Sequence, residues 1–182
     1  YLKNMSKGQQ LELSLISYDS RLPIGRQVCG LSTEEKQTLT THWNNIRTWD
    51  PEHPNLYRLT MRLLSTTGDV VHEITERIGF RTIEFRPEDG IYLNGTRLLV
   101  KGTNRHCFDP ETGRTISREL SLKDALLIKQ MNMNAVRSHY PPDTHFLEAC
   151  DSIGLLYLNE LCGWQNSYST EIAEKLLPEM MF

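Results

Sequence analysis

The chain has 182 residues, of which 24% are charged and 38% hydrophobic, and its formal net charge is -3. This composition is ordinary for a globular protein, and the scattered Lys and Arg residues give no support for a nucleic-acid-binding surface. No apolar run approaches the about 20 residues that a membrane-spanning helix needs, and the widely spaced cysteines predict neither a structural zinc site nor a dense disulfide framework.

The first part of the chain has the pattern of antiparallel β-strands, because apolar and polar side chains alternate there between turn residues. The segments predicted as strands are residues 10–18, 38–46, 56–65 and 70–80. We expect a loop at 20–30, where prolines and glycines interrupt the pattern. Short strands at this spacing predict a β-sandwich over residues 1–86. Because this segment is short for a complete sandwich, we expect further strands to precede Tyr1.

A second hairpin follows, and the chain then changes to alternating helices and strands. Asn94-Gly95 between two apolar arms is a strong signal for a hairpin turn, and residues 101–106 (KGTNRH) end the next apolar run. Helices are predicted at 121–132, 143–153 and 170–181, with strands at 134–138 and 155–158. Ser121 is the expected N-cap of the first helix, and Gly154 is expected to end the second. This order predicts parallel strands with right-handed crossovers over residues 87–182.

Polar side chains gather where the predicted parallel strands end. The three endings are Asn104-Arg105-His106, Arg137-Ser138-His139 and Asn159-Glu160. In a parallel barrel, residues at the carboxyl ends of the strands face the active site. Three such endings in succession predict a site whose candidate residues are Asn104, Arg105, His106, Arg137, His139 and Glu160.

Each candidate also has a structural alternative. His106 could hydrogen-bond the loop that follows it, and Arg137 could form an ion pair with Glu160 across neighbouring strands. Asp109 could bind a ligand or cap the turn that follows. Trp164 could stack on a sugar ring or belong to the core.

Two other chemistries are less favoured interpretations of the same residues. His106, His139 and Glu160 form a ligand set that could hold zinc or iron, but the short-spaced His pair of common metal motifs is missing. Cys107 beside His106 could be a nucleophile, but adjacent residues on an extended segment point to opposite faces.

Five segments carry a resemblance to a known family, and their order and spacing match from about Trp49 to the last residue. They read WDPEHPNLYRL, IGFRTIEF, DGIYLNGTRLLVKGTNRH, LIKQMNMNAVRSHYPPD and CDSIGLLYLNE. The sequence resembles the family 2 glycoside hydrolases, the β-galactosidase and β-glucuronidase group, and ELCGWQ is most similar to β-galactosidase-like members. The resemblance implies an immunoglobulin-like β-sandwich followed by the first part of a TIM (β/α)8 barrel.

The resemblance also implies a reaction, the retaining hydrolysis of terminal β-glycosidic bonds in an oligosaccharide or β-glycoside, with no cofactor. In such enzymes one glutamate protonates the leaving oxygen and a second forms the glycosyl-enzyme intermediate, with the two carboxyls about 5–5.5 Å apart. By similarity, His106 and His139 match substrate-contacting histidines, while Arg137 and Glu160 match polar residues that line the sugar pocket. Both catalytic glutamates of the family's pattern fall beyond residue 182, so we expect this chain to be inactive alone.

Some positions depart from the family's pattern. Members usually have one more residue between the Arg and the His of the second ending, as in R-x-S-H-Y-P, and a one-residue slip along an extended segment reverses a side chain. Cys107 stands where Glu is common. Trp164 and Asn166 replace the Glu and His of the galactosidase metal site, so magnesium dependence is not supported.

The main alternative is a non-catalytic β-sandwich module for carbohydrate binding or subunit contact. An incomplete barrel would also leave a strand edge exposed, which favours either association, for example into a homo-oligomer, or disorder. The sugar, the linkage and the cellular compartment stay open.

Overall fold

The computed structural model describes residues 7–34, 36–160, 169–170 and 174–175. The chain forms two compact units, Tyr1–Leu98 and Leu99–Phe182, and each is described by itself. The domain boundary expected between residues 86 and 87 stays a prediction. Within the described residues, no helix is long and apolar enough to cross a membrane.

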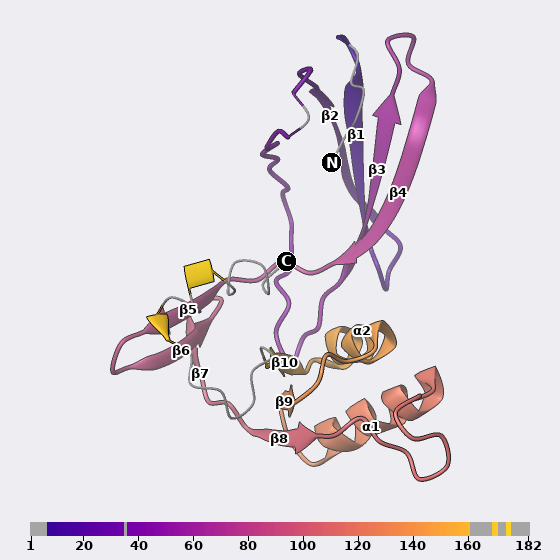
Figure 1. Ribbon diagram of the computed structural model, residues 1–182. Helices are drawn as coiled ribbons and strands as arrows, with labels where there is room; N and C mark the ends of the chain where they lie inside the picture. Colours follow the sequence, from indigo (N-terminus) through magenta and orange to yellow (C-terminus); the bar gives the residue numbers. More distant parts are fainter. Residues whose placement is uncertain (1–6, 35, 161–168, 171–173, 176–182) are drawn as a thin grey trace. The chain divides into compact units, whose positions relative to one another are not determined.

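The first unit contains a four-stranded antiparallel sheet (Figure 1). Its strands are β1 (Gln10–Ser17), β2 (Pro23–Gly30), β3 (Tyr57–Leu64) and β4 (Val70–Ile78), in the order β2-β1-β3-β4. The register places Leu13 of β1 opposite Met61 of β3, and Met61 opposite Ile74 of β4. Apolar side chains of three strands therefore share one face, as the alternation predicts.

Two segments of this unit differ from the sequence prediction. The pattern predicts a loop at 20–30, but β2 lies there, because Pro23 and the glycines are tolerated in an edge strand and next to a pairing irregularity. The pattern also predicts a strand at 38–46, where the structure has none. One backbone group of that segment bonds to a side chain and not to a strand, since the Gln27 side chain donates to the His42 carbonyl at 2.5 Å.

A second, three-stranded antiparallel sheet completes the described strands of this unit. It consists of β5 (Ile83–Arg86), β6 (Gly90–Leu93) and β7 (Thr96–Leu98), in that order. Asn94 and Gly95 join β6 to β7 with φ of 51° and 77°, the left-handed conformation that a tight hairpin turn requires. The Asn94 side chain also accepts from Thr82 N and donates to Trp49 O, both at 3.0 Å. The predicted hairpin is confirmed.

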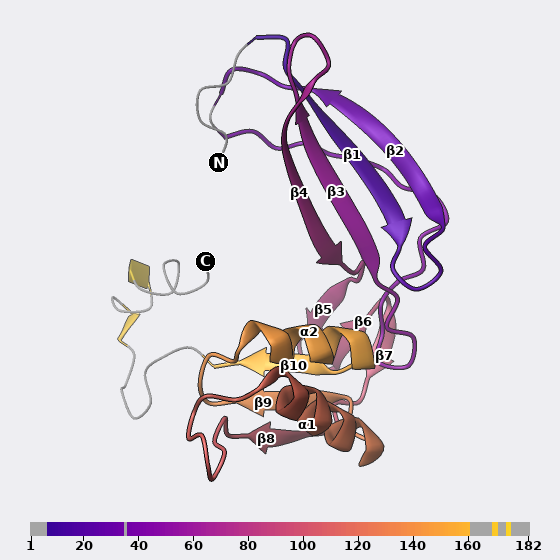
Figure 2. The same ribbon diagram turned by 90° about the vertical axis from the view of Figure 1, so that its right-hand side faces the viewer.

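The second unit alternates strands and helices around a three-stranded parallel sheet (Figure 2). Its elements are β8 (Gly102–Arg105), α1 (Arg118–Gln130), β9 (Ala135–Ser138), α2 (Thr144–Ile153) and β10 (Leu156–Asn159), with strand order β10-β9-β8. Consecutive strands are neighbours, so the sheet winds in one direction. This is the arrangement of a (β/α) barrel, whereas a doubly wound sheet reverses its strand order.

The core of this unit lies between the sheet and its two helices. Val136 of β9 packs with residues of both helices in a cluster of Ala125, Ile128, Val136, Phe146, Ala149, Cys150 and Leu155. Because the cluster contains residues of both α1 and α2, both helices cover the same face of the sheet. The opposite face, called the open face below, has no helix on it among the described residues.

The helix ends agree with the prediction in one case and differ in the other. Gly154 ends α2 with φ 85°, as predicted. The N-cap of α1 is Ser117, whose hydroxyl accepts from Leu120 N at 3.1 Å, so the predicted cap Ser121 was wrong; Ser121 is fully buried one turn inside the helix. The third helix expected at 170–181 falls mostly outside the described residues.

Candidate functional site

The parallel register aligns the three polar strand endings. Asn104 of β8 pairs with Arg137 of β9, and in the next row Arg105 pairs with Ser138, which pairs with Asn159 of β10. The three endings therefore lie at one edge of the sheet, as the order of elements predicts.

Side chains at the end of β8 alternate between the two faces of the sheet. Asn104 and His106 are exposed, whereas Arg105 and Cys107 are buried. Alternation follows from the strand geometry, which sends successive side chains to opposite sides. Asn104 and Arg137, paired in the register, share the open face, while Arg105 belongs to the helix-covered face.

Arg137 and Glu160 together join the endings into one group. The Glu160 Oε2 forms an ion pair with Arg137 Nη2 and lies 3.0 Å from His139 Nδ1. Arg137 also donates through Nη1 to Asn104 Oδ1 at 3.1 Å. Residues from all three endings therefore touch through direct polar contacts, and we call Asn104, Arg137, His139 and Glu160 the strand-end cluster.

The charge of Glu160 is held by its two partners. The hydrogen bond from His139, followed by the positive charge of Arg137, lowers the pKa of the Glu160 carboxyl, although partial desolvation opposes the shift. The Glu160 side chain is 25% exposed, so solvent screens these interactions in part. Glu160 is therefore a carboxylate near neutral pH and acts as an acceptor.

Two histidines and a tyrosine form an aromatic group beside this cluster. The His106 ring lies 6.4 Å from the His139 ring and 5.8 Å from the Tyr140 ring, between centroids, and His139 and Tyr140 are 4.9 Å apart. The Arg114 guanidinium lies 4.1 Å from the Tyr140 ring centroid. Sequence reasoning gave no role to Tyr140 or Arg114. The adjacency of Tyr140 to His139 was a usable signal, whereas nothing in the pattern pointed to Arg114.

A depression of about 440 Å³ adjoins the strand-end cluster on the open face. Its lining includes Asn104 and Arg137, together with the small residues Gly102 and Ala135 and the apolar Leu158. A mixed lining of hydrogen-bonding and apolar groups is typical of small-molecule sites.

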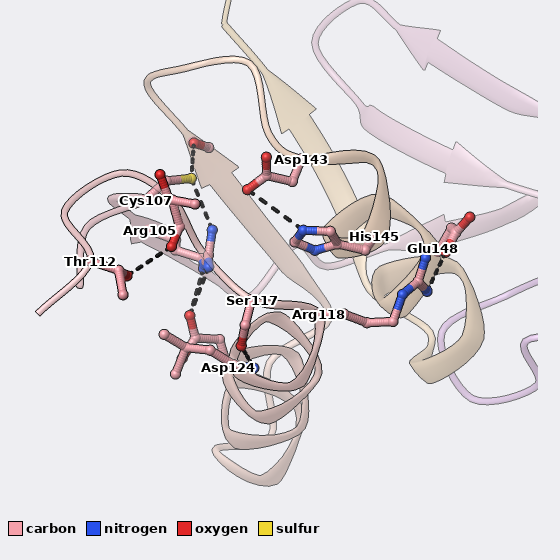
Figure 3. Close-up of polar contacts among 12 residues, drawn as sticks. Arg105, Cys107, Thr112, Ser117, Arg118, Asp124, Asp143, His145 and Glu148 are labelled. Atoms are coloured by element: carbon pink, nitrogen blue, oxygen red, sulfur yellow. Dashed lines mark hydrogen bonds and ion pairs between the residues drawn. The ribbon is translucent and has the colours of Figure 1, made fainter.

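Arg105 does not join the other candidates. It donates through Nε to Asp124 Oδ2 of α1 at 2.9 Å and through Nη1 to Cys107 Sγ at 2.9 Å (Figure 3). Its guanidinium also lies 4.0 Å from the Phe146 ring centroid. All these partners lie on the helix-covered side. We therefore do not include Arg105 among the residues available to a ligand.

Asp109 caps a turn. Its Oδ1 accepts from Glu111 N at 3.0 Å and from Thr112 N at 2.9 Å, and these backbone hydrogen bonds, that of Thr112 first, lower the pKa of the carboxyl. Of the two expectations for Asp109, the geometry favours the turn cap. Trp164 lies outside the described residues.

The alternative chemistries find little support in the geometry. Among the described residues, no three His, Cys, Asp or Glu side chains gather as metal ligands. Cys107 Sγ contacts Arg105 and, at 3.9 Å, Ser138 Oγ, on the side of the sheet away from the strand-end cluster. Cys29, Cys107 and Cys150 are free thiols.

Comparison with known proteins places both units in one family. Residues 18–81 match the model of glycosyl hydrolases family 2, and residues 84–175 match that of the glycosyl hydrolases family 2 TIM barrel domain. A beta-galactosidase of Thermoanaerobacterium thermosulfurigenes is 40% identical over 142 residues, which are 75% of this chain and 19% of the relative. A beta-galactosidase of Lactococcus lactis is 44% identical over 117 residues, which are 64% of this chain and 12% of the relative.

A solved structure agrees with these relatives. The beta-glucuronidase of Parabacteroides merdae, with glycerol in its active site, superposes with a TM-score of 0.78 and 25% identity over 99% of this chain and 23% of its own length. The predicted fold class, an immunoglobulin-like sandwich followed by the first part of a TIM barrel, is confirmed. The chain spans less than a quarter of the length of each of these proteins. With the family models matching nearly the whole chain, the chain belongs to glycosyl hydrolase family 2.

Proposed function

We propose that the strand-end cluster binds the terminal sugar of a β-glycoside, and that the protein to which this chain belongs is a retaining exo-β-glycosidase of the β-galactosidase type. In this proposal residues 1–86 are its sandwich part and 87–182 its barrel part. One observation carries the proposal: direct polar contacts join side chains from three consecutive strand endings, because Arg137 contacts both Asn104 and Glu160.

The chemistry of the cluster suits a sugar. Sugar hydroxyls donate and accept hydrogen bonds, and the cluster offers carboxylate, amide, guanidinium and imidazole groups within contact of one another. His106, with its ring 6.4 Å from His139, adds a second imidazole at the edge of the group. The shortened Arg137-Ser138-His139 spacing keeps both Arg137 and His139 on Glu160, which supports Arg137 as a sugar contact.

Glu160 is a binding group in this proposal and not the acid/base of the reaction. A general acid needs a raised pKa, whereas His139 and Arg137 lower that of Glu160. Retaining hydrolysis also needs two carboxyls about 5–5.5 Å apart. Among the described members of the cluster, Glu160 is the one carboxylate. We therefore expect this 182-residue chain to bind sugar without hydrolysing it.

Sugar binding can be tested on the chain itself by saturation-transfer NMR with methyl β-galactoside, with methyl β-glucuronide as the second ligand. Arg137→Met is expected to abolish the saturable signal. The matched control Arg86→Met also removes an Arg–Glu pair, that of Arg86 with Glu84, but in the other unit, and should leave binding unchanged. Equal binding by wild type and Arg137→Met would overturn the site, and turnover of nitrophenyl β-galactoside by the chain would overturn its expected inactivity.

One observation favours the alternative of a binding sandwich. The first unit has a cavity of about 320 Å³, lined by polar side chains that include Asp19, Asn45, Arg47 and Asn55. If sugar binds there, Asp19→Ala should abolish the NMR signal while Arg137→Met leaves it intact. The proposed site gives the opposite pattern.

Self-association is proposed separately. β8 and β10 are the outer strands of the parallel sheet among the described residues, and an unpaired strand edge favours pairing with another chain. Sedimentation velocity over a range of concentrations should show a dimer or larger species. A single monomeric species throughout would contradict this.

A further inference from the structure

A buried polar network lies behind the strand-end cluster, on the helix-covered face. At its centre is Arg105, whose side chain is 7% exposed. Its Nε and Nη2 lie 2.9 Å and 2.8 Å from Asp124 Oδ2 (Figure 3). Its guanidinium lies 4.0 Å from the Phe146 ring centroid. Burial of a guanidinium is costly unless it is paired and hydrogen-bonded, so these contacts fix the side chain in place.

The network continues from Arg105 to the second strand ending. Arg105 Nη1 donates to Cys107 Sγ at 2.9 Å, and Cys107 Sγ lies 3.9 Å from Ser138 Oγ. Ser138 is fully buried, and its Oγ donates to Tyr140 O at 3.0 Å and accepts from Tyr140 N at 3.4 Å. The Ser138 hydroxyl therefore closes a turn that contains His139.

Network residues flank both histidines in the sequence. His106 lies between Arg105 and Cys107, and His139 lies between Ser138 and Tyr140. The buried partners on one face therefore set the backbone from which each histidine projects. The contact between Cys107 and Ser138 links the two backbones to each other.

We propose that Arg105 and Cys107 are positioning residues, which hold His106 and His139 at the spacing that a sugar requires. The value of that spacing for binding rests on the proposed function. The positioning itself does not, because it concerns only the geometry of the two rings. A binding site depends on the residues that hold the ligand-contacting side chains in place as well as on those side chains themselves.

A second ion pair provides a matched control. Arg118 of α1 donates to Glu148 of α2 at 2.7 Å, so it too is an Arg–carboxylate pair that involves α1. The Arg118 side chain is 70% exposed, and its described contacts do not reach a strand ending. Loss of this pair tests for a general effect of removing an ion pair from the unit.

The experiment measures nuclear Overhauser cross-peaks between ring protons in the 182-residue chain. Wild type should show cross-peaks from His106 to His139 and to Tyr140, and Cys107→Ala and Arg105→Met should lose them. The cross-peak between the sequence neighbours His139 and Tyr140 serves as an internal reference. Arg118→Met should keep all of them. Retention of the His106 cross-peaks in folded Cys107→Ala and Arg105→Met would overturn the proposal.

Conservative variants separate positioning from stability. Arg105→Lys keeps the positive charge and a hydrogen bond to Asp124, but a single ammonium group cannot also reach Cys107 as the guanidinium does. This variant should therefore fold and still lose the His106 cross-peaks. Cys107→Ser keeps a polar side chain of similar size and should retain them. If Arg105→Met does not fold, Cys107→Ala and Arg105→Lys decide the result, since both leave Asp124 a cationic partner.

Methyl β-galactoside added to the same samples separates the two proposals. If wild type shows the ring cross-peaks but binds no sugar, the proposed function fails and the positioning network stands. If wild type and Cys107→Ala bind sugar equally while Cys107→Ala has lost the cross-peaks, the spacing does not matter for binding and the functional part of the inference is overturned.

Discussion

Gly102→Ala should damage the sheet at the place where β8 meets β9. A methyl group on Gly102 would lie 2.9 Å from the backbone oxygen of Ala135 and 3.2 Å from its carbonyl carbon. Real Cβ atoms do not approach so closely, and the obstructing atoms are backbone that cannot rotate away. Because Gly102 and Ala135 are register partners, the two strands must move apart.

The expected change in the free energy of unfolding for Gly102→Ala is the difference of two opposing effects. Forcing an extra methyl group into a packed site typically costs about 1–3 kcal/mol, and replacing Gly by Ala recovers about 0.4–1 kcal/mol from the lower entropy of the unfolded chain. We expect a net destabilisation of about 1–2 kcal/mol, which lowers hydrogen-exchange protection about 5- to 30-fold. The assay is amide exchange by NMR at β8 and β9.

Gly30→Ala is the matched control. No atom lies within 4 Å of the Cβ that Gly30 would gain, and its backbone is not left-handed. Protection at β1 and β2 should therefore stay unchanged or rise. Unchanged or increased protection at β8 and β9 in Gly102→Ala would refute the close approach of the strands.

Three further predictions concern charge, packing and thiol reactivity. The pKa of Glu160 is lower in the folded than in the unfolded chain, so the ionised Glu160 stabilises the fold. This contribution is fully present above the unfolded-state pKa and is lost as the pH falls through the folded-state pKa. His139→Ala should raise the Glu160 midpoint in a carboxyl ¹³C titration, and an unchanged midpoint would contradict the assigned cause. Phe146 is fully buried, so Phe146→Ala should lower the free energy of unfolding by about 3–5 kcal/mol, measured by urea denaturation. A decrease below about 1 kcal/mol would contradict the packing of this side chain. Burial raises the pKa of Cys150 to about 12, so at about pH 8 iodoacetamide should label Cys29 but not native Cys150, and equal labelling in peptide mapping would count against burial.

The topology of the second unit was predictable because its signals are long and mutually consistent. Helical spacing over ten or more residues, short apolar strands and the Gly154 stop specify β8 to β10 with their crossovers. The N-cap of α1 was not predictable from the pattern. Serine is a residue type that favours the N-cap, and the sequence has one at 117 and another one helical turn later at 121. The structure has Ser117 as the cap, while Ser121 is buried inside the helix.

The first unit shows where local pattern fails. Pro23 suggests a loop, yet an edge strand accepts it, because position in the sheet is a tertiary property. Apolar and polar residues alternate over 38–46 as they do in a strand. A strand also needs a neighbouring strand to hydrogen-bond with, and residues 38–46 pair with none in the described structure.

The part of the candidate site that depends only on the alignment of neighbouring parallel strands was predictable. Strand endings aligned by parallel pairing bring Asn104, Arg137 and Glu160 to one edge, which follows from element order alone. Arg105 was misplaced by treating three consecutive residues as one group, although alternation sends the middle one to the opposite face. The ring contact of Tyr140 with His106 depends on how two loops meet, which spacing does not encode.

The most direct test of the central claim is a titration of the isotope-labelled 182-residue chain with methyl β-galactoside, followed by NMR at side-chain resolution. We expect saturable shifts concentrated on the Asn104 amide, the Arg137 guanidinium and the His106 and His139 rings. Shifts confined to the cavity around Asn45 and Arg47, or no saturable shift at all, would contradict it.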